Sequence, residues 1–213
     1  MIHLAQRFRD YLARKRQQQI ARQFREGGYK PWTPGYDVYK WETIAQLIHS
    51  GRPFSEVLGT ERFGYRIDER IVEYGWLFDR LTPAAGAMLD AGSALNFWTI
   101  VNHPKITSKR LVISTLAPES AAYWNLGISY VYEDLRQTCL RDEAFDTIVS
   151  ISTIEHVGMD NTMLYTSDQR LAENAPDEYL PFLDVLRRLL KPGGKLFLSF
   201  PYGRRKNHGW FQV

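Results

Sequence analysis

The sequence contains little cysteine and no long apolar run, and both shortages restrict what the chain can be. Its 213 residues include one cysteine, Cys139, which excludes an internal disulfide and suits a reducing compartment. No segment approaches the roughly 20 consecutive apolar residues that a membrane-spanning helix needs. The first residues, MIHLAQRFRDYLARKR, contain no apolar stretch of the length found in secretory signal peptides. We therefore expect a soluble, cytoplasmic protein.

Several catalytic signatures are also missing. The sequence has no G-x-S-x-G, Walker or G-x-G-x-x-G loop, which argues against hydrolases and nucleotide triphosphatases. The missing G-x-G-x-x-G likewise makes a nicotinamide-dependent oxidoreductase a poor alternative. The five histidines show no metal-ligand spacing, so we expect no metal. A net charge of only +3 gives weak attraction to nucleic acid, and we expect no nucleic-acid partner.

The amino-acid composition is that of a globular chain with one sizeable core, since 44% of the residues are hydrophobic and 14% aromatic. The pattern along the chain changes near residue 80. We predict an N-terminal helical extension and linker over residues 1–80, followed by an α/β domain over residues 81–213.

Residues 1–26 are predicted to form a basic helix. Its apolar side chains recur at roughly helical spacing, at Leu4, Phe8, Leu12, Ile20 and Phe24. Its charges are Arg7, Arg9, Arg14, Lys15, Arg16, Arg22 and Arg25 against Asp10 and Glu26, a local net charge of +5. Such a helix can contact a membrane surface or a polyanion, or it can dock its thin apolar stripe on the protein body or on a second copy in a homodimer. The narrow, interrupted stripe favours docking.

Residues 26–37 are predicted to form a turn-rich linker, because Gly27-Gly28, Pro31 and Pro34-Gly35 all break regular structure. We expect its aromatic residues Tyr29, Trp32 and Tyr36 to pack against the body. Helices are predicted over 37–50 and 67–81, with Asp68 as the N-cap of the second. The apolar face of that second helix consists of Ile71, Tyr74, Leu77, Phe78 and Leu81.

Short apolar runs begin at residue 86 and alternate with longer helical or irregular stretches. Five strands are predicted, over residues 87–90, 110–115, 128–133, 145–152 and 195–200. The runs lack strict polar alternation, which is typical of parallel strands covered on both faces. Crossovers of this length predict a doubly wound α/β sheet with helices on both faces. A helix within residues 176–194 is expected to stop at Pro192-Gly193-Gly194 before the last strand.

Polar and glycine residues follow the predicted strands in a particular order. Asp90 ends the first strand and Gly92 lies just past it. Asp134 follows the third strand, Phe145-Asp146 opens the fourth, and STIEH (152–156) and LKPGG (190–194) come later. In this order residues 86–203 resemble the class I S-adenosylmethionine-dependent methyltransferases. More loosely, DERIVEY, LDAGS and STIEHVGMDN look like bacterial methyltransferases associated with surface-glycan clusters.

The resemblance implies a Rossmann-like sheet of order 3-2-1-4-5, S-adenosyl-L-methionine as cofactor, and a small molecule or glycan precursor as acceptor. It places the loop of Asp90, Gly92, Ser93 and Ala94 beneath the methionine part of the cofactor, and Ser152 beside the same part. Thr115 and Leu116 fall at the ribose end, and Asp134 and Leu135 at the adenine. Two features depart from the family: Ala94 and Asn96 replace glycines, and Thr115 replaces the acid that grips the ribose. Glu119 is a possible substitute for that acid.

His156 is the candidate general base for a hydroxyl acceptor, because imidazole titrates near neutral pH. Glu155 could orient His156 or serve as the base itself; alternatively, the pair only caps a turn. Residues 161–178 form either a lid over the acceptor or a surface loop. Further polar and aromatic groups are expected on the same rim: Met159, Asp160, Asn161, Tyr202, Arg204, Arg205, His208 and Trp210.

The five predicted strands are fewer than the seven typical of the family. The chain is therefore expected to lack the last two strands, or to cover the exposed fifth strand with another element or subunit. The altered glycine loop leaves a second functional reading open, in which the domain is a catalytically inactive methyltransferase-like interaction module.

Overall fold

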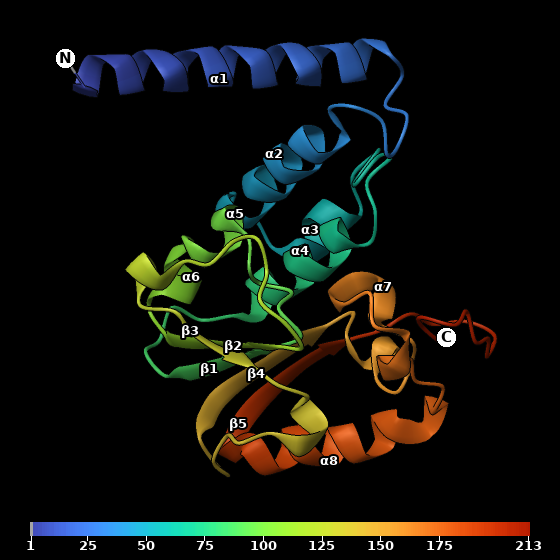
Figure 1. Cartoon of the computed structure of the whole chain (residues 1–213). Helices are drawn as coiled ribbons and strands as arrows, with labels where there is room; N and C mark the ends of the chain where they lie inside the picture. The colour runs from blue at the N-terminus through green and yellow to red at the C-terminus, as the bar shows by residue number, and fades with distance from the viewer. Residues whose placement is uncertain (1) are drawn as a thin grey trace. The chain divides into compact units, whose positions relative to one another are not determined.

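The computed structural model describes the backbone of residues 2–213 and the side chains of residues 7, 8, 11–13 and 15–213. The chain divides into two compact units, Met1–Leu81 and Thr82–Val213 (Figure 1). The side chains of Leu4, Arg9, Asp10 and Arg14 of the basic helix lie outside the described residues. Within the described part of the chain, every helix is too short or too polar to cross a membrane.

The N-terminal unit contains four helices: α1 (Ile2–Glu26), α2 (Tyr36–His49), α3 (Phe54–Leu58) and α4 (Arg70–Arg80). The predicted apolar face of α4 is confirmed, because all five of its residues are buried. The cap position of α4 is Glu69, one residue after the predicted Asp68. The Asp68 carboxylate still accepts a hydrogen bond from the Arg70 backbone N at 3.3 Å, and its other oxygen binds Lys40 Nζ at 2.8 Å. One carboxylate therefore serves both the first turn of α4 and an ion pair with α2.

Aromatic contacts join α1 to α2 and the linker. The Phe24 ring lies 5.7 Å from that of Tyr29 and 5.4 Å from that of Tyr39. Tyr36 is buried as expected, but the prediction for Trp32 is wrong, because its side chain is 74% exposed and contacts only the edge of the unit through Tyr36. These contacts fix the C-terminal half of α1 on α2.

The C-terminal unit is built on a five-stranded sheet of order β3-β2-β1-β4-β5, and every neighbouring pair is parallel. The strands are β1 (Ala87–Ala91), β2 (Arg110–Thr115), β3 (Ser129–Tyr132), β4 (Phe145–Ile151) and β5 (Leu190–Ser199). The predicted doubly wound architecture and strand order are confirmed. All five residues of β1 are buried, as expected for a central strand of a parallel sheet.

Helices cover both sides of this sheet. Figure 1 shows α8 (Tyr179–Leu189) on one side and the short helices α5 (Trp98–Val101) and α6 (Pro104–Thr107) on the other. The core on the α8 side is formed by alternate residues of β1, by β4 and by one face of α8. The remaining elements are short: η1 (Trp124–Leu126), η2 (Leu135–Gln137), η3 (Ile154–His156), α7 (Thr162–Tyr165), η4 (Gln169–Leu171) and η5 (Pro176–Glu178).

The Pro-Gly-Gly segment before β5 differs from the prediction of a separate turn. The last strand begins at Leu190, which pairs with Phe145, and the register shifts before Lys195 pairs with Thr147. Residues 192–194 therefore form an irregularity inside the strand, where proline and glycine are tolerated because the ladder is already interrupted.

The Phe145-Asp146 pair has a structural role at the start of β4. Phe145 is 4% exposed and belongs to the core. The Asp146 carboxylate accepts a hydrogen bond from the Ala87 backbone N at 2.8 Å and binds Lys191 Nζ at 2.8 Å. These contacts tie the beginnings of β1, β4 and β5 together. The hydrogen bonds and charge of Lys191 lower the pKa of Asp146.

Candidate active site

The strand order reverses between β1 and β4, so their carboxyl ends flank the crevice where ligands bind in open α/β sheets. Gly92 follows β1 and has a φ of +113°. A Cβ added at Gly92 would lie 2.1 Å from Thr153 Oγ1, in the loop after β4. The glycine is therefore required here by the close approach of Thr153, a residue that the sequence analysis did not single out.

Asp90 holds the loop that follows β1. Its side chain is fully buried, and its two carboxylate oxygens accept hydrogen bonds from the backbone N atoms of Ala94 (3.1 Å) and Leu95 (2.7 Å). A carboxylate that accepts two backbone donors fixes the loop without a glycine at position 94. Asp90 thus fixes the backbone that follows β1.

Asn96, which stands where the family has a glycine, connects three segments. Its Nδ2 donates to Glu119 Oε2 at 2.8 Å and to the Ala121 carbonyl at 3.0 Å, while its Oδ1 accepts from the Tyr130 hydroxyl at 2.9 Å. Glu119, the possible substitute for the missing acid, is therefore engaged by Asn96. Asn96 therefore holds the loop after β1 to the loop after β2 and to strand β3.

Two hydroxyl groups at the carboxyl ends of neighbouring strands lack a hydrogen-bond partner among the described residues. Ser93 is 7% exposed and Thr115 is 4% exposed, and the oxygen of each is buried and unpartnered. A buried unsatisfied polar group costs about 1–3 kcal/mol. The backbone is also unusual here, since Ser93 after β1 and Ser152 after β4 have φ values of +64° and +44°. Such conformations cluster at ligand sites, where the surrounding structure holds them in place.

The loop after β3 carries Asp134 and Leu135. Asp134 is the N-cap of η2: its carboxylate accepts from the Arg136 backbone N at 2.9 Å and is gripped by the Arg136 guanidinium at 2.5–3.0 Å. Burial raises the pKa of Asp134, but the hydrogen bonds and charge of Arg136 outweigh that effect and leave the pKa below its usual value. The carboxylate assigned to the adenine is thus shared with an arginine.

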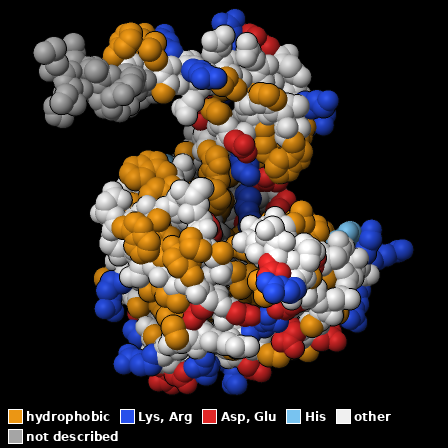
Figure 2. Space-filling view, in the orientation of Figure 1, with side chains coloured by type: hydrophobic (Ala, Val, Ile, Leu, Met, Phe, Trp, Pro, Cys, Tyr) orange, Lys and Arg blue, Asp and Glu red, His pale blue; other side chains and the backbone are white. Residues whose placement is uncertain are grey.

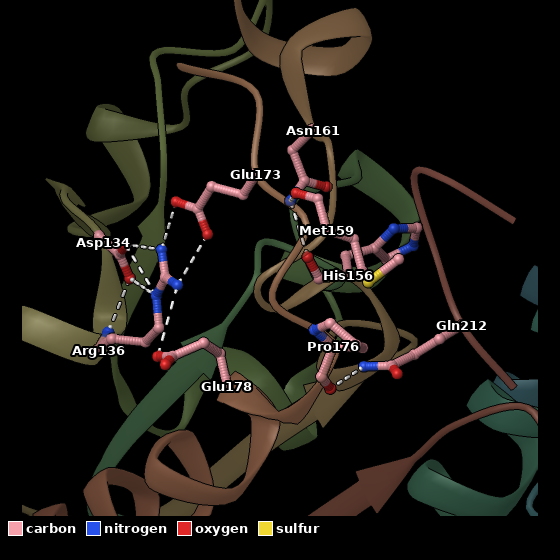
Figure 3. A network of polar contacts seen from close by, with 9 residues as sticks. All are labelled: Asp134, Arg136, His156, Met159, Asn161, Glu173, Pro176, Glu178 and Gln212. Atoms are coloured by element: carbon pink, nitrogen blue, oxygen red, sulfur yellow. Dashed lines mark hydrogen bonds and ion pairs between the residues drawn. The ribbon is translucent and has the colours of Figure 1, made fainter. Parts of the chain in front are cut away.

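Arg136 reaches onward to the segment predicted as a lid or surface loop. Its guanidinium forms two hydrogen bonds to Glu173, at 2.7 and 2.8 Å, and lies 3.7 Å from Glu178 (Figure 3). The hydrogen bond to Asp134, followed by that to Glu173, raises the pKa of Arg136. One arginine therefore links the loop after β3 to residues 161–178.

The other end of residues 161–178 is anchored at the loop after β4. Asn161 Nδ2 donates to the carbonyls of His156 and Met159, at 2.8 and 2.9 Å (Figure 3). Gly158, at φ +73°, admits the Ala175 carbonyl, which would lie 2.1 Å from an added Cβ. The segment is thus held to the loop after β4 near its start, and to the loops after β3 and β4 near its end.

His156 and Glu155 lie in η3, immediately after β4. His156 Nδ1 lies 2.8 Å from the Trp210 carbonyl, and its ring centroid lies 5.0 Å from that of Trp210. Since a carbonyl can only accept, this nitrogen carries a proton in the neutral imidazole. Glu155 is 7% exposed, and its carbonyl accepts from the Gln212 backbone N at 3.0 Å.

The segment after β5 supplies part of the expected rim. The Gly209 carbonyl accepts from the Asp160 backbone N at 3.0 Å, and His208 stacks on Phe211 with centroids 4.4 Å apart. Tyr202 is 99% exposed, and Arg205 pairs with the exposed Asp177. The structure therefore brings Asp160, His208 and Trp210 toward His156 and leaves Tyr202 and Arg205 outside this cluster.

The main functional residue missed by sequence reasoning is Arg136. A signal was present, because within the C-terminal unit Asp-x-Arg occurs twice, at 134–136 and 168–170, and each aspartate caps a short 3₁₀ turn. Only the long-range partner Glu173 distinguishes the first pair. Among the described residues, His, Cys, Asp and Glu side chains do not gather in threes suitable for a metal.

Residues 107–198 match the family described as "Methyltransferase domain", a span from α6 to near the end of β5. This match implies S-adenosylmethionine as the cofactor of the domain. It begins after the loop of Asp90 to Asn96, so that loop lies outside the matched region. A comparison with curated proteins finds no match.

Solved structures with a similar arrangement include three of archaeal or bacterial origin. A Pyrococcus horikoshii protein is 19% identical (60% of this chain, 55% of that chain, TM-score 0.43). S-adenosylmethionine-dependent methyltransferases of Mesorhizobium loti and Methanosarcina mazei are 14% and 16% identical, with TM-scores of 0.38 and 0.37 over 58% and 56% of this chain. The aligned part is 50% and 54% of those two structures. The chain thus spans about half the length of these three proteins.

Proposed function

We propose that this chain is an S-adenosylmethionine-dependent methyltransferase whose acceptor is a small molecule or glycan precursor. The observation that carries the proposal is the pair of buried, unpartnered hydroxyls of Ser93 and Thr115 at the carboxyl ends of β1 and β2. Ser93 follows β1, one of the two strands that flank the switch point, and Thr115 ends the neighbouring strand β2, in the unit that contains the methyltransferase match. A ligand that hydrogen-bonds to both would remove their desolvation cost.

The chemical types of the residues at this site suit S-adenosylmethionine. Ser93 and Ser152, next to the two strained strand ends, would hold the methionine part, and Thr115 with Leu116 the ribose end. Asp134 would accept from the adenine amino group with the oxygen lone pairs that Arg136 leaves available, and Leu135 would supply backbone contacts. When bound, S-adenosylmethionine supplies a methyl group on a sulfonium, which a nucleophile displaces in line.

His156 is the proposed general base on the acceptor side. The Trp210 carbonyl holds the proton on Nδ1, so Nε2 carries the lone pair that takes a proton from an acceptor hydroxyl. Glu155, one residue before it, would position the same turn. The rings of Trp210 and Phe211 lie 5.0 and 6.2 Å from the imidazole and offer flat apolar surfaces to a sugar. This environment supports a glycan-like acceptor.

The alternative function, an inactive interaction module, is supported by a specific observation. Thr153 fills the open side of Gly92, and Arg136 occupies the Asp134 carboxylate, so two positions assigned to the cofactor contact protein side chains. If these contacts persist in the presence of cofactor, they have a structural role and leave no place for the cofactor. The domain would then bind a protein partner instead.

The two functions are separated by a thermal-unfolding experiment with S-adenosylhomocysteine. We expect millimolar ligand to raise the unfolding midpoint, since a ligand at 100 times its Kd stabilises by about 2.7 kcal/mol. NAD at the same concentration is the matched control and should have no effect. No shift with S-adenosylhomocysteine, or a larger shift with NAD, would overturn the proposal.

The acceptor-side role of His156 is tested by His156→Gln. If His156 acts on the acceptor, the shift produced by S-adenosylhomocysteine stays as in the wild type. Loss of the shift in a folded His156→Gln protein would contradict that role and would make His156 part of the cofactor pocket.

A further inference from the structure

Helix α1 has two apolar faces that point in nearly opposite directions. In its C-terminal half, Ala21 and Phe24 are 1% and 4% exposed and lie against α2 and the linker. At about 100° per residue, Phe24 lies about 160° around the helix from Phe8. Phe8, Tyr11 and Leu12 are 61%, 53% and 49% exposed. The apolar stripe read from the sequence is therefore two separate surfaces, and only the second is used inside the unit.

The exposed face of α1 is bordered by positive charge. Arg7, Lys15 and Arg16 are all exposed, and Lys15 Nζ lies 5.7 Å above the Tyr11 ring. Around the helix, Lys15 lies between Phe8 and Tyr11, while Arg7 and Arg16 flank the apolar group on opposite sides. Figure 2 shows hydrophobic and basic side chains next to each other on α1, beside the grey atoms.

From this geometry we infer that α1 binds an anionic lipid surface, with Phe8, Tyr11 and Leu12 inserted among the headgroups and the flanking basic residues on the lipid phosphates. Apolar residues on one face with Lys and Arg at its borders characterise helices that lie in a membrane interface. This inference goes beyond the proposed methyltransferase function and is independent of it.

Charge favours lipid over the other occupants of this face. A second copy of α1 would bring two helices, each with a net charge of +5 over residues 1–26, into contact. Nucleic acid would neutralise the charge but would leave three large apolar side chains without a role. An anionic membrane satisfies both the charge and the apolar group, and the interaction weakens with salt.

The experiment is co-sedimentation of the full chain with vesicles of phosphatidylcholine alone or with about one third phosphatidylserine. We expect binding to the anionic vesicles only. Phe8→Ala/Tyr11→Ala/Leu12→Ala should weaken it at least about tenfold. Arg7→Gln/Lys15→Gln/Arg16→Gln should weaken it about 100-fold, since each basic residue near the surface contributes about fivefold. The control Arg52→Gln/Arg141→Gln/Arg187→Gln removes equal charge elsewhere and should bind as the wild type does.

Four results would overturn the inference. The first is no binding to anionic vesicles at low salt. The second is binding that the alanine variant retains in full, together with tight binding to a duplex oligonucleotide. The third is self-association in sedimentation equilibrium that the alanine variant abolishes. The fourth is a lower unfolding midpoint of the alanine variant without lipid, which would mean that the protein's own body covers this face.

Discussion

Two Asp-x-Arg turns in the C-terminal unit have the same local geometry and different surroundings. Asp134 and Asp168 each cap a 3₁₀ turn and each bind the arginine two residues later, Arg136 or Arg170. The Arg136 side chain is 20% exposed and continues to Glu173, whereas that of Arg170 is 89% exposed. The local sequence determines both turns. The distant residue Glu173 makes the Arg136 turn, and not the Arg170 turn, a link between two segments beside the candidate site.

Asp134→Ala tests the comparison with the largest expected effect. It removes a cap and leaves a half-buried arginine with one partner fewer, so we expect a loss of about 2 kcal/mol in the free energy of unfolding by urea. Asp168→Ala is the matched control and should cost clearly less. Equal losses would mean that only the local turn matters.

Arg136→Gln removes both the long-range contact with Glu173 and the contact with Asp134 inside the turn. The carboxylates of Asp134, Glu173 and Glu178 then face one another without a cation, and we expect a loss of about 1–2 kcal/mol, reduced by solvent screening. Arg170→Gln should unfold at the same urea concentration as the wild type. If both arginine variants unfold at the same urea concentration, the long-range contacts of Arg136 do not stabilise the fold.

The pH dependence of stability sharpens the same difference. Because Arg136 holds the pKa of Asp134 below its unfolded value of about 3.9, the stabilisation is present above that pH and is lost as the pH falls through the folded-state pKa. The gap in stability between the wild type and Arg136→Gln should therefore be constant from about pH 5 to 7 and shrink below about pH 4. A gap that widens in acid would contradict the assignment.

The smallest expected effect is the coupling between Arg136 and Glu173. A double-mutant cycle with Arg136→Gln and Glu173→Gln should give about 0.5–1 kcal/mol, since Glu173 is 40% exposed. The same cycle between Arg170 and Glu173 should give no coupling. Zero coupling in the first cycle would show that the ion pair in Figure 3 adds no stability.

The sequence predicts the sheet well, because parallel strands that are covered on both faces appear in the sequence as short apolar runs. β2 spans the predicted residues 110–115, and the strand order is the one that the family resemblance implied. The start of β5 was missed, because a bulge allows Pro192 and two glycines inside a strand. Trp32 was missed because an aromatic residue in a linker carries no signal of which side it faces.

The site is only partly readable from the sequence. Asp90 and Gly92 could be placed after β1, because both follow directly from the strand end. Arg136 could not be assigned, because Glu173 lies 37 residues away and its approach depends on the tertiary path of residues 161–178. Asn96 has the same limitation, since two of its partners, Glu119 and Tyr130, come from other segments.

Calorimetry with S-adenosylhomocysteine on the wild type, Asp134→Ala and Asp168→Ala tests the central claim most directly. We predict measurable binding to the wild type, the same affinity for Asp168→Ala, and an affinity at least about tenfold lower for Asp134→Ala, in line with the loss of a charge-assisted hydrogen bond. No heat of binding to the folded wild type, or equal affinity for all three proteins, would contradict the account.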